Sequence, residues 1–135
     1  MAEPRVLDAF AIMAYLQDEP SADRVEELLD DANAGRLNVW MATVNLAEVL
    51  YKVERAQGFP AAQQFIDNLP AIAVRFVDAD MELSAAAARV KAAFPVSLAD
   101  AYATALAQRL SAAVVTGDPD FKRLEDIVKV EWLPA

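Results

Sequence analysis

The sequence predicts an α/β domain in three layers, with helices on both faces of a central, mostly parallel sheet of about five strands. Short apolar segments of strand length alternate with longer amphipathic segments along the chain, which is the pattern of strands joined by helical crossovers. The 135 residues, 56% of them hydrophobic, fit one domain with a core of its own. No linker, repeat or low-complexity segment divides the chain, so residues 1–135 are expected to form a single unit.

The first part of the chain is predicted to form one strand and two helices. Residues 5–7 are a short apolar run of strand length, and residues 9–16 favour a helix. Residues 21–34 are predicted to form a second helix that is capped by Ser21, a residue type favoured at N-caps.

The middle of the chain is predicted to contain two strands and two helices. Residues 38–42 form the next strand, and residues 44–57 form a helix that ends at Gly58, a residue type that often terminates helices. A short helix over residues 61–68 then leads to a strand near residues 73–77.

The last part begins with two predicted helices. Residues 80–94 are rich in alanine, keep their apolar side chains on one face and stop before Pro95. Residues 97–110 form another helix, in which four side chains are expected to face inward: Leu98, Tyr102, Ala105 and Leu106. Residues 113–116 indicate a buried strand. Residues 128–133 alternate apolar with charged residues, which suits an edge strand covered on one face.

The chain contains no cysteine and no histidine. These absences exclude disulfides, thiolate zinc sites, histidine as a general base and every imidazole metal site. Any hydrolytic chemistry must therefore use carboxylates, lysines, hydroxyls or a metal ion held by oxygen atoms.

The net charge of −9, from 12 basic and 21 acidic residues, suits a cation or a basic partner. A nucleic-acid ligand would need a local group of basic side chains or a bound metal, because phosphates are bound by positive charge. The first twenty residues carry Glu3, Asp8 and Asp18 and no long apolar run, so no signal peptide or membrane span is expected. The chain is predicted to be cytoplasmic.

Four acidic residues stand at one edge of the predicted sheet. Asp8 follows the first strand, Asp118 follows the strand that ends at Thr116, and Glu48 and Asp100 lie in the first turns of helices. The carboxyl ends of parallel strands and the amino ends of the following helices share one edge, where open α/β sheets bind ligands. The four carboxylates are therefore expected to converge. Carboxylates this crowded repel one another unless a cation neutralises them, and oxygen ligands favour Mg²⁺ or Mn²⁺.

Each acid also has a purely structural interpretation. Asp8 and Asp118 could be helix N-caps, and the other two acids could be the third residues of capping boxes that begin at Asn45 and Ser97. Four independent caps would have no reason to lie on neighbouring strands, so their common position favours a shared site.

Four short segments are informative as an ordered set. They are Val6-Leu7-Asp8, Asn45-Leu46-Ala47-Glu48, Ser97-Leu98-Ala99-Asp100-Ala101 and Thr116-Gly117-Asp118-Pro119-Asp120-Phe121. In this order they resemble the PIN-domain ribonucleases, especially the toxins of VapBC-type toxin–antitoxin pairs. The resemblance runs over nearly the whole chain and implies a PIN-like fold. It also implies that the four acids are both metal ligands and catalytic residues, with Thr116 as hydrogen-bonding support and Asp120 as an extra outer ligand.

The chain departs from the family pattern beside the first and second acids. Ala9 and Phe10 stand where small hydroxyl residues usually follow the first aspartate, and Asn45 replaces a more usual serine or threonine as a supporting residue. These departures leave the four acids in place and concern the hydrogen bonds around them.

The resemblance implies an endoribonuclease that uses one or two Mg²⁺ or Mn²⁺ ions and leaves a 5′-phosphate. Four basic residues are candidates for RNA contacts, although a solvated helix face explains them equally well: Lys52, Arg55, Lys122 and Arg123. The resemblance also implies a cognate antitoxin and a homodimer. Five side chains are candidate contacts for them, although core packing explains several of the five equally well: Phe10, Met13, Tyr15, Val25 and Leu29.

Two other functions remain open. A catalytically inert PIN-like module would bind RNA or protein without cleaving it. A receiver-type phosphoacceptor would need a pair of acids after the first strand and a lysine after the last strand. Here Asp8 stands alone and Lys129 lies within a predicted strand, so the receiver hypothesis has little support.

Overall fold

A wholly parallel sheet forms the centre of the computed structural model, which describes residues 3–134. The sheet has five strands in the order β3-β2-β1-β4-β5. The strands are β1 (Arg5–Leu7), β2 (Val39–Ala42), β3 (Arg75–Val77), β4 (Ala113–Thr116) and β5 (Val130–Trp132). The predicted α/β class is confirmed, and β5 lies at an edge as expected.

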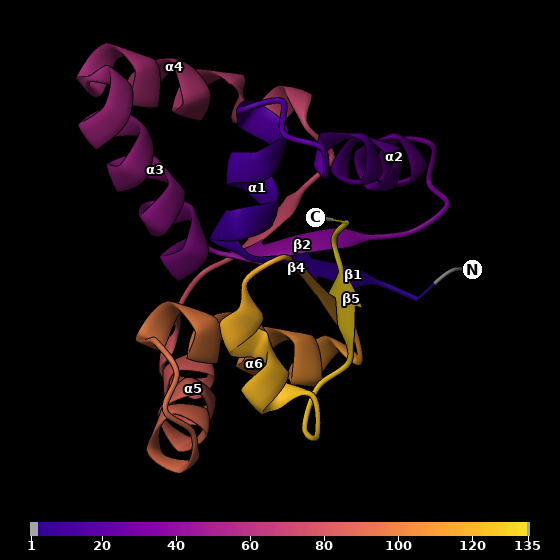
Figure 1. Ribbon diagram of the computed structural model, residues 1–135, viewed down its shortest axis with the longest axis vertical. Coiled ribbons are helices and arrows are strands. Elements are labelled where there is room, and N and C mark those ends of the chain that lie inside the picture. Colours follow the sequence, from indigo (N-terminus) through magenta and orange to yellow (C-terminus); the bar gives the residue numbers. More distant parts are fainter. Residues whose placement is uncertain (1–2, 135) are drawn as a thin grey trace.

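Helices cover both faces of the sheet and complete the three predicted layers (Figure 1). One face is covered by α1 (Ala9–Leu16), α2 (Ala22–Asn33), α3 (Thr43–Gln57) and α4 (Phe59–Asn68). The other face is covered by α5 (Met81–Ala93), α6 (Leu98–Leu110) and the 3₁₀ helix η2 (Pro119–Leu124). A second 3₁₀ helix, η1 (Leu69–Ala71), follows α4. Within residues 3–134, no helix has the length and apolar character needed to cross a membrane.

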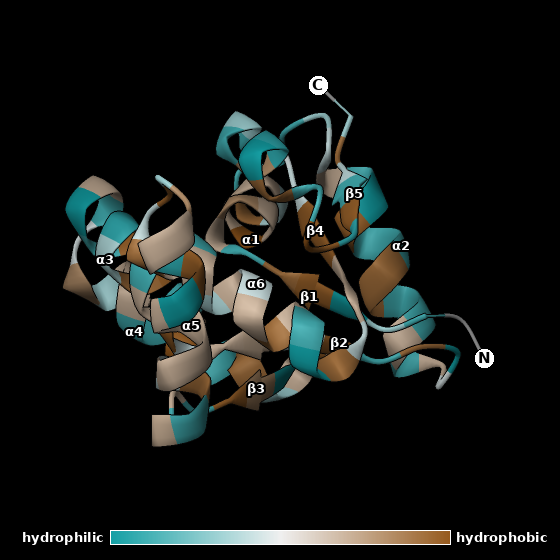
Figure 2. Cartoon of the chain, turned by 90° about the horizontal axis from the view of Figure 1, so that it is seen from below, coloured by the Kyte–Doolittle hydropathy of each residue, from teal (hydrophilic) through white to brown (hydrophobic). Residues whose placement is uncertain are grey.

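The strands are apolar at successive positions because both of their faces are buried. Val6 packs with α5 and α6, whereas the next residue, Leu7, packs with the helices of the opposite face, and Val114 and Val115 divide in the same way. Successive strand residues point to opposite faces, so a strand between two helical layers needs apolar side chains throughout. Figure 2 shows these mainly apolar strands between the helices.

Most element boundaries lie within two residues of the predicted ones, and the two 3₁₀ helices were not predicted. Ser21 stands at the N-cap of α2, but its side chain makes no capping hydrogen bond because its backbone is already helical rather than extended. Leu98 was wrongly predicted to face inward, since 53% of it is exposed. It is the first residue of α6, and burial of that helix begins only at Asp100.

An ion-pair cluster joins the edge strand β5 to the opposite end of the sequence. Glu131 accepts hydrogen bonds from Arg5 Nε at 2.9 Å and from Arg24 Nε and Nη2 at 2.8 and 3.1 Å. Burial by itself would raise the pKa of Glu131, but the hydrogen bonds from Arg24 and Arg5 outweigh it and hold the pKa below 4.5. The cluster therefore contributes stability above about pH 4.5, and this contribution is lost as the pH falls through the lowered pKa.

Glu131→Gln is expected to lower the free energy of unfolding by about 1–2 kcal/mol at neutral pH, because two partly buried guanidinium groups lose their charged partner. Urea denaturation measures the change, with the exposed Glu26→Gln as the matched control. Equal stability of the two variants would show that the cluster contributes nothing.

The order of the strands creates one place where the chain changes direction across the sheet. From β1 the chain moves outward through β2 to β3, and it then returns to form β4 and β5 on the other side of β1. The change falls between β1 and β4, and ligands of open α/β sheets bind at the carboxyl ends of strands at such a point.

Candidate metal centre

A pocket of about 300 Å³ lies at the carboxyl ends of β1 and β4. All four acids predicted from the sequence line it: Asp8, Glu48, Asp100 and Asp118. They come from the N-cap of α1, the first half of α3, the first turn of α6 and the N-cap of η2. The fold therefore brings together acids that are spread over most of the sequence.

Asp8 is buried, and its carboxylate has two fixed partners. Its Oδ1 atom accepts a hydrogen bond from the backbone N–H of Ala11 at 3.0 Å, and its Oδ2 atom accepts one from the hydroxyl of Thr116. Asp8 is therefore an N-cap, as its structural interpretation predicted, and it also lines the pocket. The two interpretations do not exclude one another.

Burial raises the pKa of Asp8 from 3.8 to about 7. The hydrogen bonds from Thr116 and Ala11 lower it, and the charges of Asp100 and Asp118 raise it further, but burial dominates. The ionised form of this carboxyl is therefore poorly stabilised by the protein alone, and a bound cation would favour it.

Thr116 connects the ends of the two central strands. It is fully buried at the end of β4, donates its hydroxyl hydrogen to Asp8, and accepts the backbone N–H of Asp118 at 3.0 Å. These contacts match the supporting position that the resemblance assigned to it. Removing the hydroxyl would free Asp8 and the start of η2 together.

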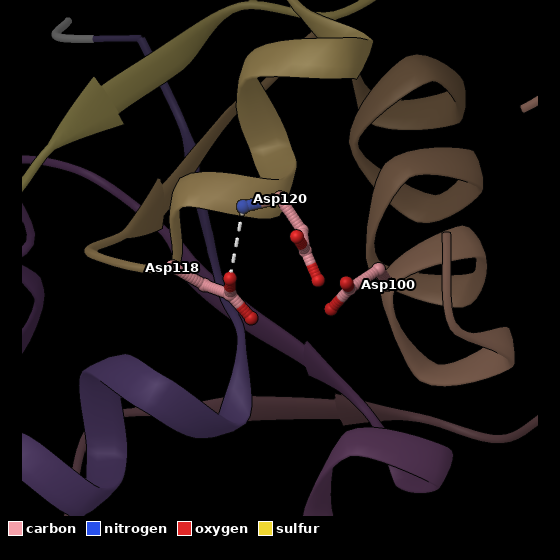
Figure 3. A group of neighbouring side chains, drawn as sticks. All are labelled: Asp100, Asp118 and Asp120. Carbon is pink, nitrogen blue, oxygen red and sulfur yellow. Dashed lines mark hydrogen bonds between the residues drawn. The ribbon is translucent and has the colours of Figure 1, made fainter. Parts of the chain in front are cut away.

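Asp100, Asp118 and Asp120 form a compact group of carboxylates (Figure 3). Each offers an oxygen atom, and these three oxygens lie within 4.8 Å of one another. Asp118 also accepts the backbone N–H of Asp120 at 2.9 Å, which fixes the start of η2. Asp120, which the resemblance suggested as an extra outer ligand, therefore lies close to Asp100 and Asp118.

Asp100 is mostly buried, and burial raises its pKa to about 6. The charge of Asp118 raises the pKa further, interaction with the side chain of Ser97 lowers it, and Glu48 and Asp120 add smaller repulsions. Ser97 also accepts the backbone N–H of Asp100 at 3.1 Å. This contact is one half of the predicted capping box.

The capping-box interpretation of Glu48 was wrong. Helix α3 begins at Thr43 after the N-cap Ala42, so Asn45 is inside the helix and cannot cap it. Glu48 instead forms an ion pair with Lys52, with 3.1 Å between Oε2 and Nζ.

Asn45 is fully buried and joins two helices that carry acids of the pocket. Its Nδ2 atom donates to the carbonyl of Ala99 at 3.1 Å, immediately before Asp100, whereas its Oδ1 atom has no hydrogen-bond partner. This contact ties α3 to the start of α6 and so supports the position of Asp100.

The four basic residues proposed for RNA contacts have different surroundings. Among the described residues, Lys52 is the basic residue that lines it. Arg55 stacks on the ring of Tyr51 at 4.8 Å, Arg123 pairs with Asp120 at 3.2 Å, and Lys122 is exposed on η2. Of the proposed dimer or antitoxin contacts, Val25 and Leu29 are buried, so the alternative interpretation by core packing is correct for these two.

Phe10 and Gly117 form a contact that the sequence analysis missed. A Cβ atom on Gly117 would lie 2.4 Å from Cε1 of Phe10, so the ring occupies the space that a side chain would need. The signal in the sequence was the glycine between Thr116 and Asp118, together with an aromatic residue two positions after Asp8.

The pocket suits a hard divalent cation. Its carboxylates offer oxygen donors from several elements, and burial, together with neighbouring carboxylates, raises the pKa values of Asp8 and Asp100, so a bound cation would favour their ionised forms. Mg²⁺ and Mn²⁺ prefer such donors, so the residues present fit the predicted type of ion.

Comparison with known proteins identifies the family. The family model of the PIN domain matches residues 5–127. Similar solved structures include VapBC2 of Rickettsia felis bound to a DNA fragment from its promoter, with 18% identity, a TM-score of 0.73, and coverage of 97% of this chain and 99% of that chain. No curated protein matches the chain in sequence.

Two further structures have the same fold. VapC20 of Mycobacterium tuberculosis, described as a toxin that cleaves the sarcin–ricin loop, is 18% identical, has a TM-score of 0.71, and aligns over 96% of this chain and 99% of its own. FitAcB of Neisseria gonorrhoeae is 22% identical, has a TM-score of 0.69, and aligns over 94% of this chain and 96% of its own. Since the family model extends from β1 past η2, the chain belongs to the PIN domain family and has the fold of solved VapBC structures.

Proposed function

We propose that this protein is a metal-dependent endoribonuclease and the toxin of a toxin–antitoxin pair. The proposal rests on one observation: in a PIN domain, Asp8, Glu48, Asp100 and Asp118 line a single pocket. The raised pKa values of Asp8 and Asp100 are consistent with it, because burial and, to a smaller extent, neighbouring carboxylates disfavour their ionised forms, and a bound cation would offset both effects.

Mg²⁺ or Mn²⁺ would be held by these four acids, with Asp120 as a further oxygen donor. A bound ion of this kind supplies a water molecule of lowered pKa and stabilises negative charge on the phosphate oxygens. The chain's own residues arrange the donors. Thr116 holds one oxygen of Asp8, and Asn45 holds the start of α6. A histidine base is not needed for this chemistry, which agrees with a chain that has none.

Partners are proposed from the relatives and from charge. VapBC-5 of Mycobacterium tuberculosis, a similar structure, is described as a member of the VapBC family of toxin–antitoxin systems, so a cognate antitoxin is the proposed protein partner. A net charge of −9 favours a basic antitoxin segment near the pocket. RNA is the proposed substrate, the protein is proposed to work as a homodimer, and the cytoplasm is its proposed location.

The experiment combines metal dependence with one conservative variant. Structured and unstructured RNAs are incubated with the wild type, Asp100→Asn and the exposed control Asp126→Asn, in Mn²⁺ or in EDTA. We expect products with 5′-phosphate ends from the wild type and the control in Mn²⁺, and no cleavage with EDTA or with Asp100→Asn. If the wild type binds RNA in Mn²⁺ without cleaving it, the inert PIN-like module is the correct description.

A further inference from the structure

We propose that Phe10 and Lys52 hold a single-stranded RNA at the rim of the acidic pocket, Phe10 by stacking on a base and Lys52 by pairing with a backbone phosphate. The inference rests on the proposed nuclease function and specifies how this chain holds its substrate. Both side chains line the pocket, Phe10 from α1 and Lys52 from α3.

The first argument concerns charge. Five acids line the pocket of a protein whose net charge is −9: Asp8, Glu19, Glu48, Asp100 and Asp118. An RNA phosphate approaching this surface is repelled unless a positive group lies close by. Lys52 is the lining residue, among those described, that supplies one.

Lys52 is placed to exchange one anionic partner for another. Its ammonium lies 3.1 Å from Glu48 one turn away on α3, and 45% of its side chain is exposed. An exposed pair of this spacing on a helix is weak. A phosphate at the rim can therefore take the place of the Glu48 carboxylate without the loss of a strong interaction.

The second argument concerns Phe10. It is the second residue of α1, and 39% of it is exposed although it is a large apolar side chain. The position of the ring is restricted, because it packs against Gly117, which lies between Thr116 and Asp118. An exposed aromatic ring held beside a nuclease pocket offers a stacking surface for an unpaired base.

Together the two contacts predict a preference for unpaired RNA. A base can stack on Phe10 only if it has left its own helix, whereas the phosphate contact of Lys52 is independent of base sequence. Phe10 and Lys52 together therefore select single-stranded over double-stranded RNA and do not select a base sequence. An antitoxin segment could instead cover Phe10, and the experiment below distinguishes this outcome.

Binding is measured with a short single-stranded RNA in Ca²⁺ in place of Mn²⁺, which separates binding from cleavage. Phe10→Leu is expected to weaken binding by about 5- to 150-fold, the usual range for one stacked base. Lys52→Gln is expected to reduce the slope of log affinity against log salt by about 0.7, the value for one single-strand phosphate contact. The controls Phe59→Leu and Lys129→Gln change an exposed aromatic and an exposed lysine outside the pocket lining and should behave as the wild type.

Modified RNAs identify the two contacts. A single abasic nucleotide at the stacking position should weaken RNA binding to the wild type but not to Phe10→Leu. One neutral methylphosphonate at the phosphate contact should likewise weaken binding to the wild type but not to Lys52→Gln.

If neither variant changes RNA affinity or its salt dependence, the proposal is wrong, and Phe10 is then better explained as a protein contact. If Lys52→Gln alters only the melting shift caused by Mn²⁺, Lys52 is merely the counter-ion of Glu48 and its assignment fails. Wild-type cleavage in Mn²⁺ is scored separately, so either result leaves the test of nuclease activity intact.

Discussion

Replacing Asp8 with asparagine is expected to abolish RNA cleavage and, at the same time, to stabilise the metal-free protein at about pH 8. Loss of one ligand carboxylate should reduce cleavage on the order of 10³-fold, since metal ions contribute several kcal/mol of charge stabilisation. The stabilisation has the opposite sign because Asp8 is buried with a pKa of about 7, against 3.8 in the unfolded chain.

The sign follows from proton linkage. A carboxyl whose pKa is raised by folding contributes most below its unfolded pKa, and this stability is lost as the pH rises from about 4 through about 7. For Asp8 the full loss corresponds to about 4 kcal/mol of the free energy of unfolding. Asparagine keeps the acceptor for Ala11 and carries no charge, so a net gain of about 2 kcal/mol at pH 8 is expected after the altered contact with Thr116.

Urea denaturation in EDTA at about pH 5 and pH 8 measures this effect, with Asp126→Asn as a control that changes an exposed carboxylate. The free energy of unfolding of Asp8→Asn should exceed that of the wild type at the higher pH and approach it at the lower pH. Excess Mn²⁺ should reverse the ranking at pH 8, because only the wild type keeps its complete set of ligands. A less stable Asp8→Asn protein in EDTA at both pH values would mean that the ionised carboxylate is well accommodated without a cation.

Mn²⁺ affinity is expected to fall on the order of 100-fold between about pH 7.5 and pH 5.5. The ion must displace protons from Asp8 and Asp100, whose pKa values burial raises to about 7 and about 6. An Mn²⁺ concentration that adds about 2.7 kcal/mol of stability at pH 7.5 should therefore add less than about 0.5 kcal/mol at pH 5.5.

Thermal melting at fixed Mn²⁺ and titration calorimetry in two buffers of different ionisation enthalpy measure this dependence and the protons released. Asp100→Asn should release fewer protons than the wild type, and Asp126→Asn should release as many. An affinity that stays constant over this pH range would show that neither buried carboxyl is a ligand, and would place the ion elsewhere or exclude it.

Local patterns in the sequence were sufficient for most of the secondary structure. The strands β1, β2 and β4 could be predicted because burial on both faces requires continuous apolar runs, and α5 because its apolar side chains keep to one face and Pro95 follows it. The helix η2 was missed because six residues of 3₁₀ helix leave no periodic pattern. Leu98 was misplaced because periodicity identifies a face of a helix and not which of its turns are covered.

The set of candidate acids could also be predicted, because the carboxyl end of each strand is recognisable in the sequence and parallel topology brings such ends together. The contacts that each acid makes could not be predicted. The pairing of Glu48 with Lys52 and the proximity of Asp120 to Asp100 depend on side-chain directions that spacing does not specify. The position of Asn45 was misread for a related reason, since α3 begins two residues before it.

The sequence by itself determined the α/β class, the order of the elements, the absence of histidine and cysteine chemistry, and the acids available to bind a cation. These properties follow from composition and from contacts between near neighbours. The tertiary structure alone decided that β1 and β4 are adjacent, that Thr116 bonds to Asp8 across 108 positions, and that Phe10 rests on Gly117. The physical reason is that such contacts form only when the sheet closes between its two helical layers, and their energies depend on burial that no local segment of the chain possesses.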